Sequence, residues 1–203
     1  LLDITVRKQA EKEITETKTL LQTVVENIPL MIFLKESKDL RFVMFNHAGE
    51  ELLGYDHKDL LGKNNLDLFP PEQAAHFMAK DREVLDGEAG SMDIPEEPIN
   101  TAKKGQRLLH TRKTRIQGVD GKTKYLLGIS EDITEQKQNQ VKLQNSLIKL
   151  HETIKGTIET IAMIVETRDP YTAGHQVNVS DLAASIAMEM DLSKEQVEGI
   201  RMA

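Results

Sequence analysis

The sequence predicts an α+β domain with an antiparallel sheet, preceded by one helix and followed by a much longer one. Two short apolar runs at residues 30–34 and 40–45 are joined by a polar segment that suits a hairpin. Several short helical segments follow, and after a turn the residues from 124 to 129 alternate between the two faces of a strand. Strands, then helices, then strands again are the order of an α+β fold.

Residues 1–26 are rich in Glu, Lys, Thr and Gln and carry a thin apolar stripe, which indicates an amphipathic helix. The helix is predicted to end near Asn27, because Pro29 disfavours helical backbone at Ile28. Such a helix either pairs with a copy of itself or lies on its own domain, and the sequence leaves both arrangements open.

Capping residues and glycines divide the segment after the second strand into short helices. Asn46 is placed to cap a helix over residues 48–53, which Gly54 ends. A second short element is predicted over 55–61. A longer helix over 70–85 begins with prolines that suit its first turn.

Glycine and proline interrupt the chain from Gly87 to Pro98, where no regular element is predicted. A strand is predicted over 106–117, and a turn over 118–121. The final strand has one face on a core. In it, Tyr125, Leu127 and Ile129 alternate with Lys124, Leu126 and Gly128.

A run without proline extends from Thr134 to Arg168, and its only glycine is Gly156. Its apolar residues recur at steps of three or four, so one stripe of a long helix is expected to face a partner. A periodic run of this length predicts a coiled coil, or a helix that begins in one domain and ends in the next. The stripe consists of Leu143, Leu147, Leu150, Ile154, Ile158, Ile161 and Val165.

The composition excludes several classes of function. The 33 acidic and 26 basic residues give a net charge of −7, which opposes nonspecific attraction to nucleic acid and to anionic membranes. No apolar run is long enough to span a membrane, and the N-terminus lacks the features of a signal peptide. The absence of cysteine excludes disulfides and thiolate metal sites and fits a reducing compartment. We therefore expect a cytoplasmic protein without a nucleic-acid partner and without insertion of this segment into a membrane.

Several motifs, in this order, resemble those of PAS sensory domains with their C-terminal motif. The resemblance covers residues 19–137 and implies an antiparallel PAS-like sheet with short flanking helices. The motifs are Glu26-Asn27-Ile28-Pro29, Asn46 followed by Glu50-Glu51-Leu52-Leu53-Gly54-Tyr55, Leu61-Gly62-Lys63, Asp81-Arg82-Glu83-Val84-Leu85 and the closing stretch from Gly128 to Thr134.

The triplet Asp132-Ile133-Thr134 repeats Asp3-Ile4-Thr5, and a polar helix rich in Lys and Gln follows each copy. The repeat suggests that residues 1–18 are the helical linker from a preceding sensory domain. The sequence also begins without methionine and stops inside a predicted helix, so we expect it to be a piece of a longer protein.

Helix signals continue after the long helix. Pro170 is predicted to stop that helix, and Thr172 to cap a new one with His175 in its first turn. Ser193 and Gln196, three residues apart, form a capping box that opens a third helix.

The string Arg168-Asp169-Pro170-Tyr171-Thr172-Ala173-Gly174-His175-Gln176 resembles the opening of an HD-GYP domain, a bacterial phosphodiesterase that hydrolyses cyclic di-GMP. The resemblance assigns 154–203 to the N-terminal fragment of an all-α HD domain and 138–153 to a connecting signalling helix. It implies that His175 is the first ligand of a divalent metal pair of the iron or manganese type. Some members hold a third metal with a glutamate where Tyr171 stands here, so a two-metal site is favoured.

Such a metal pair lowers the pKa of a bound water to about 7 and clamps the attacking and leaving oxygens of the phosphodiester. The family's His-Asp pair, later histidines and GYP loop are absent from this sequence. The fragment is therefore expected to contain no catalytic residue and to lack phosphodiesterase activity. Glu166, Arg168 and Asp169 are expected to make local caps and salt bridges.

The sequence does not identify a ligand for the PAS-like domain, and it leaves open that the domain binds none. All five phenylalanines lie in this domain, and aromatic residues at such spacings normally fill a core. His76 lies on the longer helix, where some haem-binding relatives place their iron ligand, and a packed or exposed histidine is the alternative reading. His110, on a strand, is the other histidine considered. Without cysteine, neither a flavin-cysteine adduct nor a thioester-bound chromophore can form.

We therefore predict a bacterial signal-transduction protein in which a PAS sensor passes a change of state through the helix after Ile133 to an HD-GYP output domain. A homodimer through the N-terminal and connecting helices would couple two outputs.

Two alternatives remain. The PAS domain either senses a ligand, which a cavity with polar groups would favour, or serves only for dimerisation, which a dry, filled core would favour. A histidine-kinase fragment would instead use His151 or His175 as phosphoacceptor, although Pro170 and Gly174 interrupt the helix that His175 would need.

Overall fold

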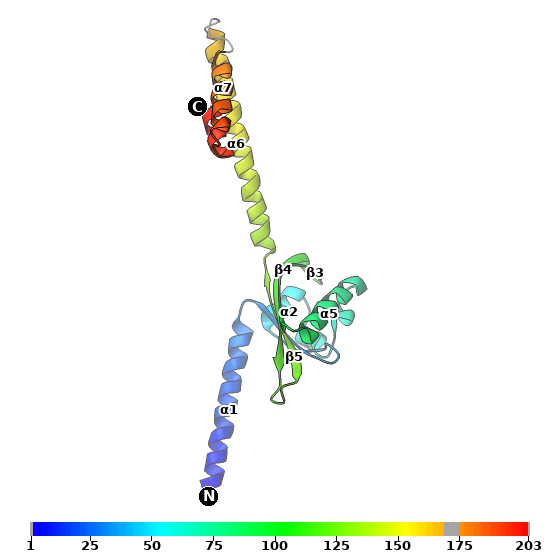
Figure 1. The fold of residues 1–203 in the computed structure, drawn as a ribbon. Helices are drawn as coiled ribbons and strands as arrows, with labels where there is room; N and C mark the ends of the chain where they lie inside the picture. The colour runs from blue at the N-terminus through cyan, green and yellow to red at the C-terminus, as the bar shows by residue number, and fades with distance from the viewer. Residues whose placement is uncertain (1, 169–174, 203) are drawn as a thin grey trace. The chain divides into compact units, whose positions relative to one another are not determined.

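The computed structural model describes residues 2–168 and 175–202. It divides into two units, Leu1–Lys137 and Gln138–Ala203. The elements, drawn in Figure 1, are α1 (Leu2–Asn27), β1 (Met31–Glu36), β2 (Phe42–Phe45), α2 (His47–Leu53), α3 (His57–Leu60), α4 (Asn65–Leu68), α5 (Pro71–Asp86), β3 (Ser91–Thr101), β4 (Gly105–Gln117), β5 (Thr123–Asp132), α6 (Thr134–Arg168), α7 (His175–Glu189) and α8 (Lys194–Met202).

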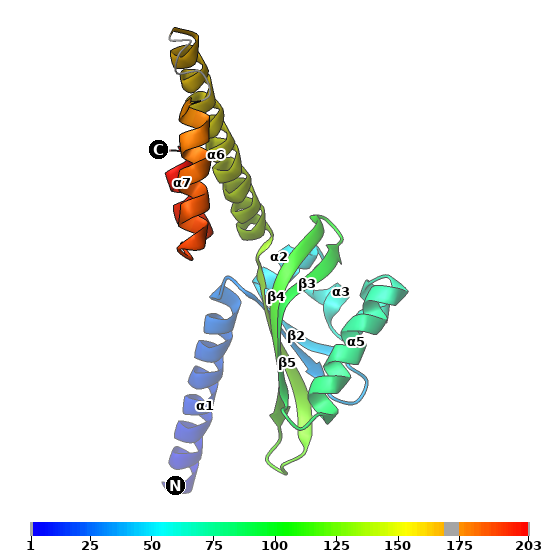
Figure 2. The same cartoon turned by 45° about the horizontal axis from the view of Figure 1, so that its top comes forward.

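The first unit holds a five-stranded sheet in the order β2-β1-β5-β4-β3, and every neighbouring pair is antiparallel. Helices α2, α3 and α5 lie against one side of it (Figure 2). On β1, Phe33 lies opposite Phe45 of β2 and Gly128 of β5. A Cβ at Gly128 would overlap the ring of Phe33, so glycine is required for this close approach. The predicted α+β fold with an antiparallel sheet is confirmed.

The core lies between the sheet and its covering helices. In β5 the alternation is confirmed, and Leu126 and Gly128 are the residues that face the core, whereas Tyr125, Leu127 and Ile129 are half-buried on the opposite face. The main cluster of buried apolar residues consists of Met31, Phe33, Phe42, Phe45, Leu52, Leu53, Leu60, Phe69, Ala74, Phe77, Ile99 and Leu109.

Strand β3 lies where the sequence predicts no regular element, and that prediction was wrong. β3 is an edge strand, where proline is tolerated because one side of the strand has no partner. Pro95 falls in a shift of register between Ile94 and Glu97, where the ladder is interrupted. The glycines and prolines that resemble a loop therefore mark an irregular edge.

Two further boundaries differ from the prediction. The second strand begins at Phe42 instead of at residue 40, because Leu40 has a left-handed backbone with φ of 55°. Helix α4 was not predicted, although Asn64 and Asp67 cap its start reciprocally.

The capping signals elsewhere are confirmed. Asn46 caps α2, accepting a hydrogen bond from Gly49 N. The box of Ser193 and Gln196 opens α8, with hydrogen bonds of 3.0 and 3.3 Å. Helix α6 spans the predicted run, Thr134–Arg168. The predicted stop at Pro170 and cap at Thr172 lie outside the described residues.

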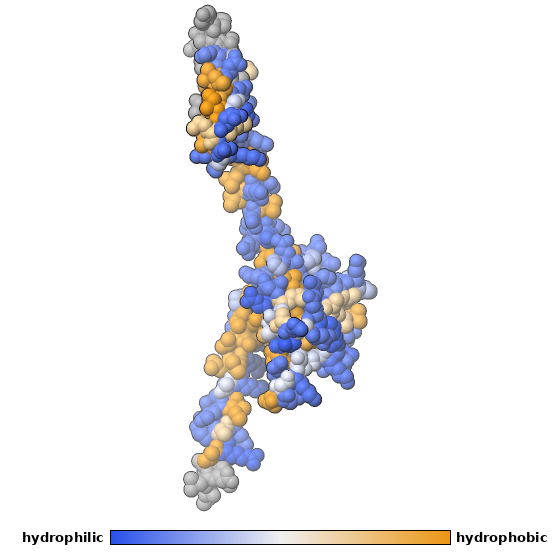
Figure 3. All heavy atoms as spheres, viewed as in Figure 1, coloured by the Kyte–Doolittle hydropathy of each residue, from blue (hydrophilic) through white to orange (hydrophobic). Residues whose placement is uncertain are grey.

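Helices α1 and α6 expose apolar side chains between charged ones (Figure 3). On α1 these include Ile14, Leu20 and Leu21. On α6 they are Leu143, Leu147, Leu150, Ile154, Ile158 and Ile161, which we call the α6 seam. The side chain of Val165 lies outside the described part of the chain.

None of the helices in the described ranges combines the length and the apolar character needed to cross a membrane.

Candidate ligand site in the core

Two lysines lie inside the core of the first unit. On β1, the inward face carries Met31 and Phe33 and continues to Lys35. On β4, the same two-residue period places Lys113 on the buried side after Leu109. Each lysine side chain is only 2% exposed, so each ammonium group requires partners inside the protein.

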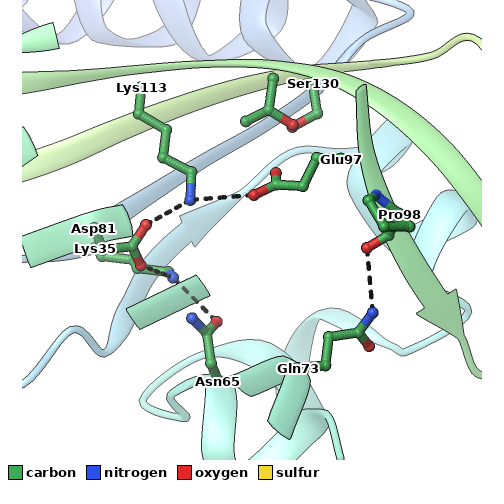
Figure 4. A network of polar contacts seen from close by, with 9 residues as sticks. Lys35, Asn65, Gln73, Asp81, Glu97, Pro98, Lys113 and Ser130 are labelled. Atoms are coloured by element: carbon green, nitrogen blue, oxygen red, sulfur yellow. Dashed lines mark hydrogen bonds and ion pairs between the residues drawn. The ribbon is translucent and has the colours of Figure 1, made fainter. Parts of the chain in front are cut away.

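Asp81 supplies those partners from helix α5. Its carboxylate is 0% exposed and lies between the two ammonium groups (Figure 4). Lys35 Nζ lies 2.5 Å from Asp81 Oδ2, and Lys113 Nζ lies 2.8 Å from Asp81 Oδ1. One carboxylate therefore joins β1, β4 and α5 at a single buried point.

The charges of this cluster influence one another. Burial alone raises the pKa of the Asp81 carboxyl, but the ammonium groups of Lys35 and Lys113 outweigh burial and hold that pKa below its ordinary value. Burial lowers the pKa of the Lys35 ammonium, and Asp81 opposes this only in part. Asp81 is therefore held in its ionised form.

Glu97 and Asn65 complete the polar cluster. Glu97 Oε1, on β3, lies 3.7 Å from Lys113 Nζ, which is an ion-pair distance but too long for a hydrogen bond. Asn65 Oδ1, at the start of α4, accepts a hydrogen bond of 3.0 Å from Lys35. In the part of the chain that the structure describes, Asn65 Nδ2 and Glu97 Oε1 are buried without a hydrogen-bond partner.

These polar groups border a small cavity. It has a volume of about 40 Å³ and is lined by Lys35, Asn65, Glu97, Lys113, Ser130 and apolar residues that include all five phenylalanines. Lys35 Nζ also lies 4.5 Å from the centroid of the Phe42 ring, a cation–π contact. A water molecule occupies about 30 Å³ of liquid, so the space suits one or two waters or a molecule of a few heavy atoms and is far smaller than a haem.

The histidines singled out by the sequence lie elsewhere. His76 is exposed on α5 and does not line the cavity. His110 Nε2 lies 3.1 Å from Asp93 Oδ1 at the surface, and its hydrogen bond lowers the pKa of the Asp93 carboxyl. His151 is exposed on α6, and His175 is exposed at the start of α7.

Within the described ranges, no group of three or more His, Asp or Glu side chains is arranged to hold a metal ion. His175 therefore belongs to no such group among these residues, and Tyr171 lies outside them.

The first turn of α6 is attached to β3 and β4, two of the strands that border the cavity. Leu108 of β4 donates through its N–H to Thr134 Oγ1 at 2.8 Å and accepts from Ile133 N at 2.9 Å. Lys137 Nζ lies 2.6 Å from Glu96 Oε1 of β3, with the two side chains 41% and 54% exposed. The start of α6 is thus held by a hydrogen-bonded pair and by an ion pair.

A family model described as the PAS fold matches residues 25–138. A blue-light-activated histidine kinase from Rhizobium johnstonii is 26% identical over 77% of this chain and 47% of its own length. The methanogenesis regulatory histidine kinase FilI from Methanothrix harundinacea is 29% identical over 60% of this chain and 13% of its own length. The chain thus spans less than half the length of both relatives.

Among solved structures, the PAS domain of a protein from Colwellia psychrerythraea superposes with a TM-score of 0.51 at 17% identity. The match covers 60% of this chain and 98% of that domain. At this level of identity the likeness supports the fold.

Proposed function

Because this chain belongs to the PAS fold family, we propose that it is the sensor and transmitter of a longer signal-transduction protein, in which the state of the core cavity is passed to α6. The cavity with its polar groups favours sensing over a purely structural dimerisation module.

The observation that carries this proposal is the attachment of α6 to β3 and β4. Successive residues of a strand point to opposite faces. Glu97 therefore reaches the cavity while its neighbour Glu96 reaches Lys137. On β4, the side chain of Leu109 lines the cavity, and the backbone of the preceding residue, Leu108, is hydrogen-bonded to Thr134. A shift of either strand at the cavity moves the first turn of α6 directly.

Exchanging the charges of the surface ion pair tests this transmission. Glu96→Lys and Lys137→Glu each place like charges together and should speed amide hydrogen exchange in the first two turns of α6 by about twofold to fivefold. The double variant restores opposite charges and should restore slow amide exchange in α6 and the response of the output to the signal. Mass spectrometry measures the amide exchange.

Lys142→Glu, further along α6, is the matched control and should leave exchange in the first turns unchanged. The fold should survive all these changes, because an exposed ion pair contributes at most about 1 kcal/mol. A double variant that exchanges as fast as the single ones would contradict the proposed attachment.

For the output, the first candidate is an HD-GYP phosphodiesterase. Its support is the string from Arg168 to Gln176, with His175 as one metal ligand. A neutral imidazole suits a divalent metal pair of the iron or manganese type, which would supply an activated water against the phosphodiester of cyclic di-GMP.

The second candidate output is a histidine kinase. The two curated relatives described above are histidine kinases, and His151 lies exposed in the continuous helix α6, with Glu152 next to it. An exposed histidine on a helix is accessible to a phosphate donor, so this candidate remains beside the first.

We further propose that the chain forms a homodimer through α1 and α6. The α6 seam advances by steps of three and four, which suits pairing with a second parallel helix. The exposed apolar residues of α1 suit the same arrangement.

A further inference from the structure

Two polar atoms of residues that line the cavity lack hydrogen-bond partners, and one is a donor whereas the other is an acceptor. Asn65 Nδ2 carries hydrogens that lack an acceptor, and Glu97 Oε1 lacks a donor, among the residues that the structure describes. Their side chains are 2% and 5% exposed, and both line the cavity (Figure 4). Buried polar atoms of this kind normally bind water or a ligand. Asn65 Nδ2 requires an acceptor and Glu97 Oε1 requires a donor, and a hydroxyl or a primary carboxamide offers both.

The charges at the cavity are already balanced. When all four groups are ionised, Lys35 and Lys113 carry two positive charges and Asp81 and Glu97 carry two negative charges. A charged ligand would bring an uncompensated charge into a site walled by phenylalanine rings, which is unfavourable. A neutral ligand leaves the balance intact.

The size of the cavity limits the rest of the molecule. About 40 Å³ accommodates a polar group and one or two carbon atoms. Phe42 and Phe69 are among the lining rings, so the carbon part of such a molecule finds apolar contacts.

From these observations we propose that the cavity binds small neutral molecules with a hydroxyl or a primary amide, held by hydrogen bonds to Asn65 Nδ2 or to Glu97 Oε1. The inference rests on the proposed sensor function, whose signal it assigns to a chemical class. Asn65 and Glu97 set the specificity, and the balanced lysines and carboxylates exclude ions.

Two pairs of probes of similar size test the class on the whole chain. Formamide is compared with formate, and methanol with methylammonium, at matched ionic strength. The methyl NMR signals of Leu53, Ile99 and Leu109, which line the cavity, report binding. The neutral probes should shift these signals in a saturable manner, with dissociation constants of about 1 mM or weaker for so few atoms. The ions should bind at least about tenfold more weakly.

Glu97→Gln provides a switch of specificity. The substitution keeps the shape of the side chain and leaves one surplus positive charge at the cavity. Formate should then bind more tightly than formamide, the reverse of the wild type. Glu96→Gln is the matched control: it changes the neighbouring surface residue and should preserve the wild-type order.

The wild-type comparison needs no variant, so poor folding of Glu97→Gln would not leave the question open. Equal binding of formate and formamide to the wild type would overturn the proposal, as would unshifted methyl signals with both neutral probes in the folded chain. Either result leaves the charge-exchange test of α6 intact. Conversely, the neutral probes could bind while exchanging the charges of Glu96 and Lys137 has no effect on amide exchange in α6. That result would refute the proposed transmission to α6 and support the proposed ligand class.

Discussion

At the scale of single residues, the fold depends on Asp81. Its carboxylate is the shared partner of two ammonium groups on almost fully buried lysine side chains. Such a cluster is stabilising only while it is complete, because removing one member leaves an unpaired buried charge. Asp81 thus ties the long covering helix to two strands that are not neighbours in the sheet.

Asp81→Asn should lower the free energy of unfolding by about 3 to 5 kcal/mol at neutral pH. It should also remove part of the acid sensitivity. The pKa of Asp81 is depressed in the folded state, whereas in the unfolded chain it is about 3.9. As the pH falls below about 4, Asp81 becomes protonated in the unfolded chain while it stays ionised in the folded chain. The free energy of unfolding therefore decreases with falling pH until the pH reaches the pKa of Asp81 in the folded state. Urea unfolding as a function of pH measures both effects.

Asp86→Asn is the control, since Asp86 is exposed on the same helix. It should change the free energy of unfolding by no more than about 0.5 kcal/mol and keep the acid slope of the wild type. If Asp81→Asn showed the wild-type slope, the depressed pKa of Asp81 would not be the source of acid sensitivity.

The sequence contains part of this site and conceals the rest. The two-residue period of β1 and β4 places Lys35 and Lys113 on the inward face, and the helical period from Phe77 places Asp81 inward on α5. What no local pattern contains is that the three side chains meet, because this depends on the packing of α5 over two strands. The exposed His76 shows the converse: its residue type suggested a ligand, and its position on the helix points it to solvent.

At the scale of elements, prediction succeeded where a local interaction ends or begins a helix. Asn46 and the box of Ser193 and Gln196 act within a few residues of the chain, so their effect is readable from sequence. β3 depends instead on pairing along the whole length of a hairpin with β4, and its prolines conceal it. The apolar residues of α6 are periodic over many turns, and the helix has the predicted bounds, Thr134–Arg168.

The periodicity of α6 leads to a test by insertion after Lys137. Each helical residue adds about 100°, so four residues rotate the seam by about 40° beyond a full turn, whereas seven nearly restore its phase. Duplicating residues 138–141 should therefore abolish the response of the output in the full-length protein, and duplicating 138–144 should largely keep it. The output activity with and without signal is the measurement.

Both inserts repeat sequence already present in α6, so helix propensity is matched. Equal responses of the two variants would mean that the phase of the seam does not carry the signal. In that case the coupling would have to act through the length or the stability of α6 and not through the orientation of its apolar face.

At the scale of the whole molecule, the two candidate outputs make different histidines essential. A metal pair of the HD-GYP type needs the imidazole of His175 as a ligand, and nothing in its chemistry involves His151. A histidine kinase needs an acceptor on an accessible, uninterrupted helix, which describes His151. Both side chains are exposed, so either can be replaced without disturbing a core.

If the output is an HD-GYP phosphodiesterase, His175→Ala in the full-length protein should lower hydrolysis of cyclic di-GMP at least about 100-fold, because losing a direct ligand weakens metal binding more than losing a residue behind it. His151→Ala should leave hydrolysis unchanged. Two assays distinguish the outputs. Hydrolysis of cyclic di-GMP in the presence of manganese or iron reports the phosphodiesterase, and transfer of labelled phosphate from ATP reports the kinase. Phosphate transfer that His151→Ala abolishes and His175→Ala spares would assign the sensor to a kinase instead. The signal would then act on the middle of α6 itself, within a few turns of the Glu96 and Lys137 pair that starts it.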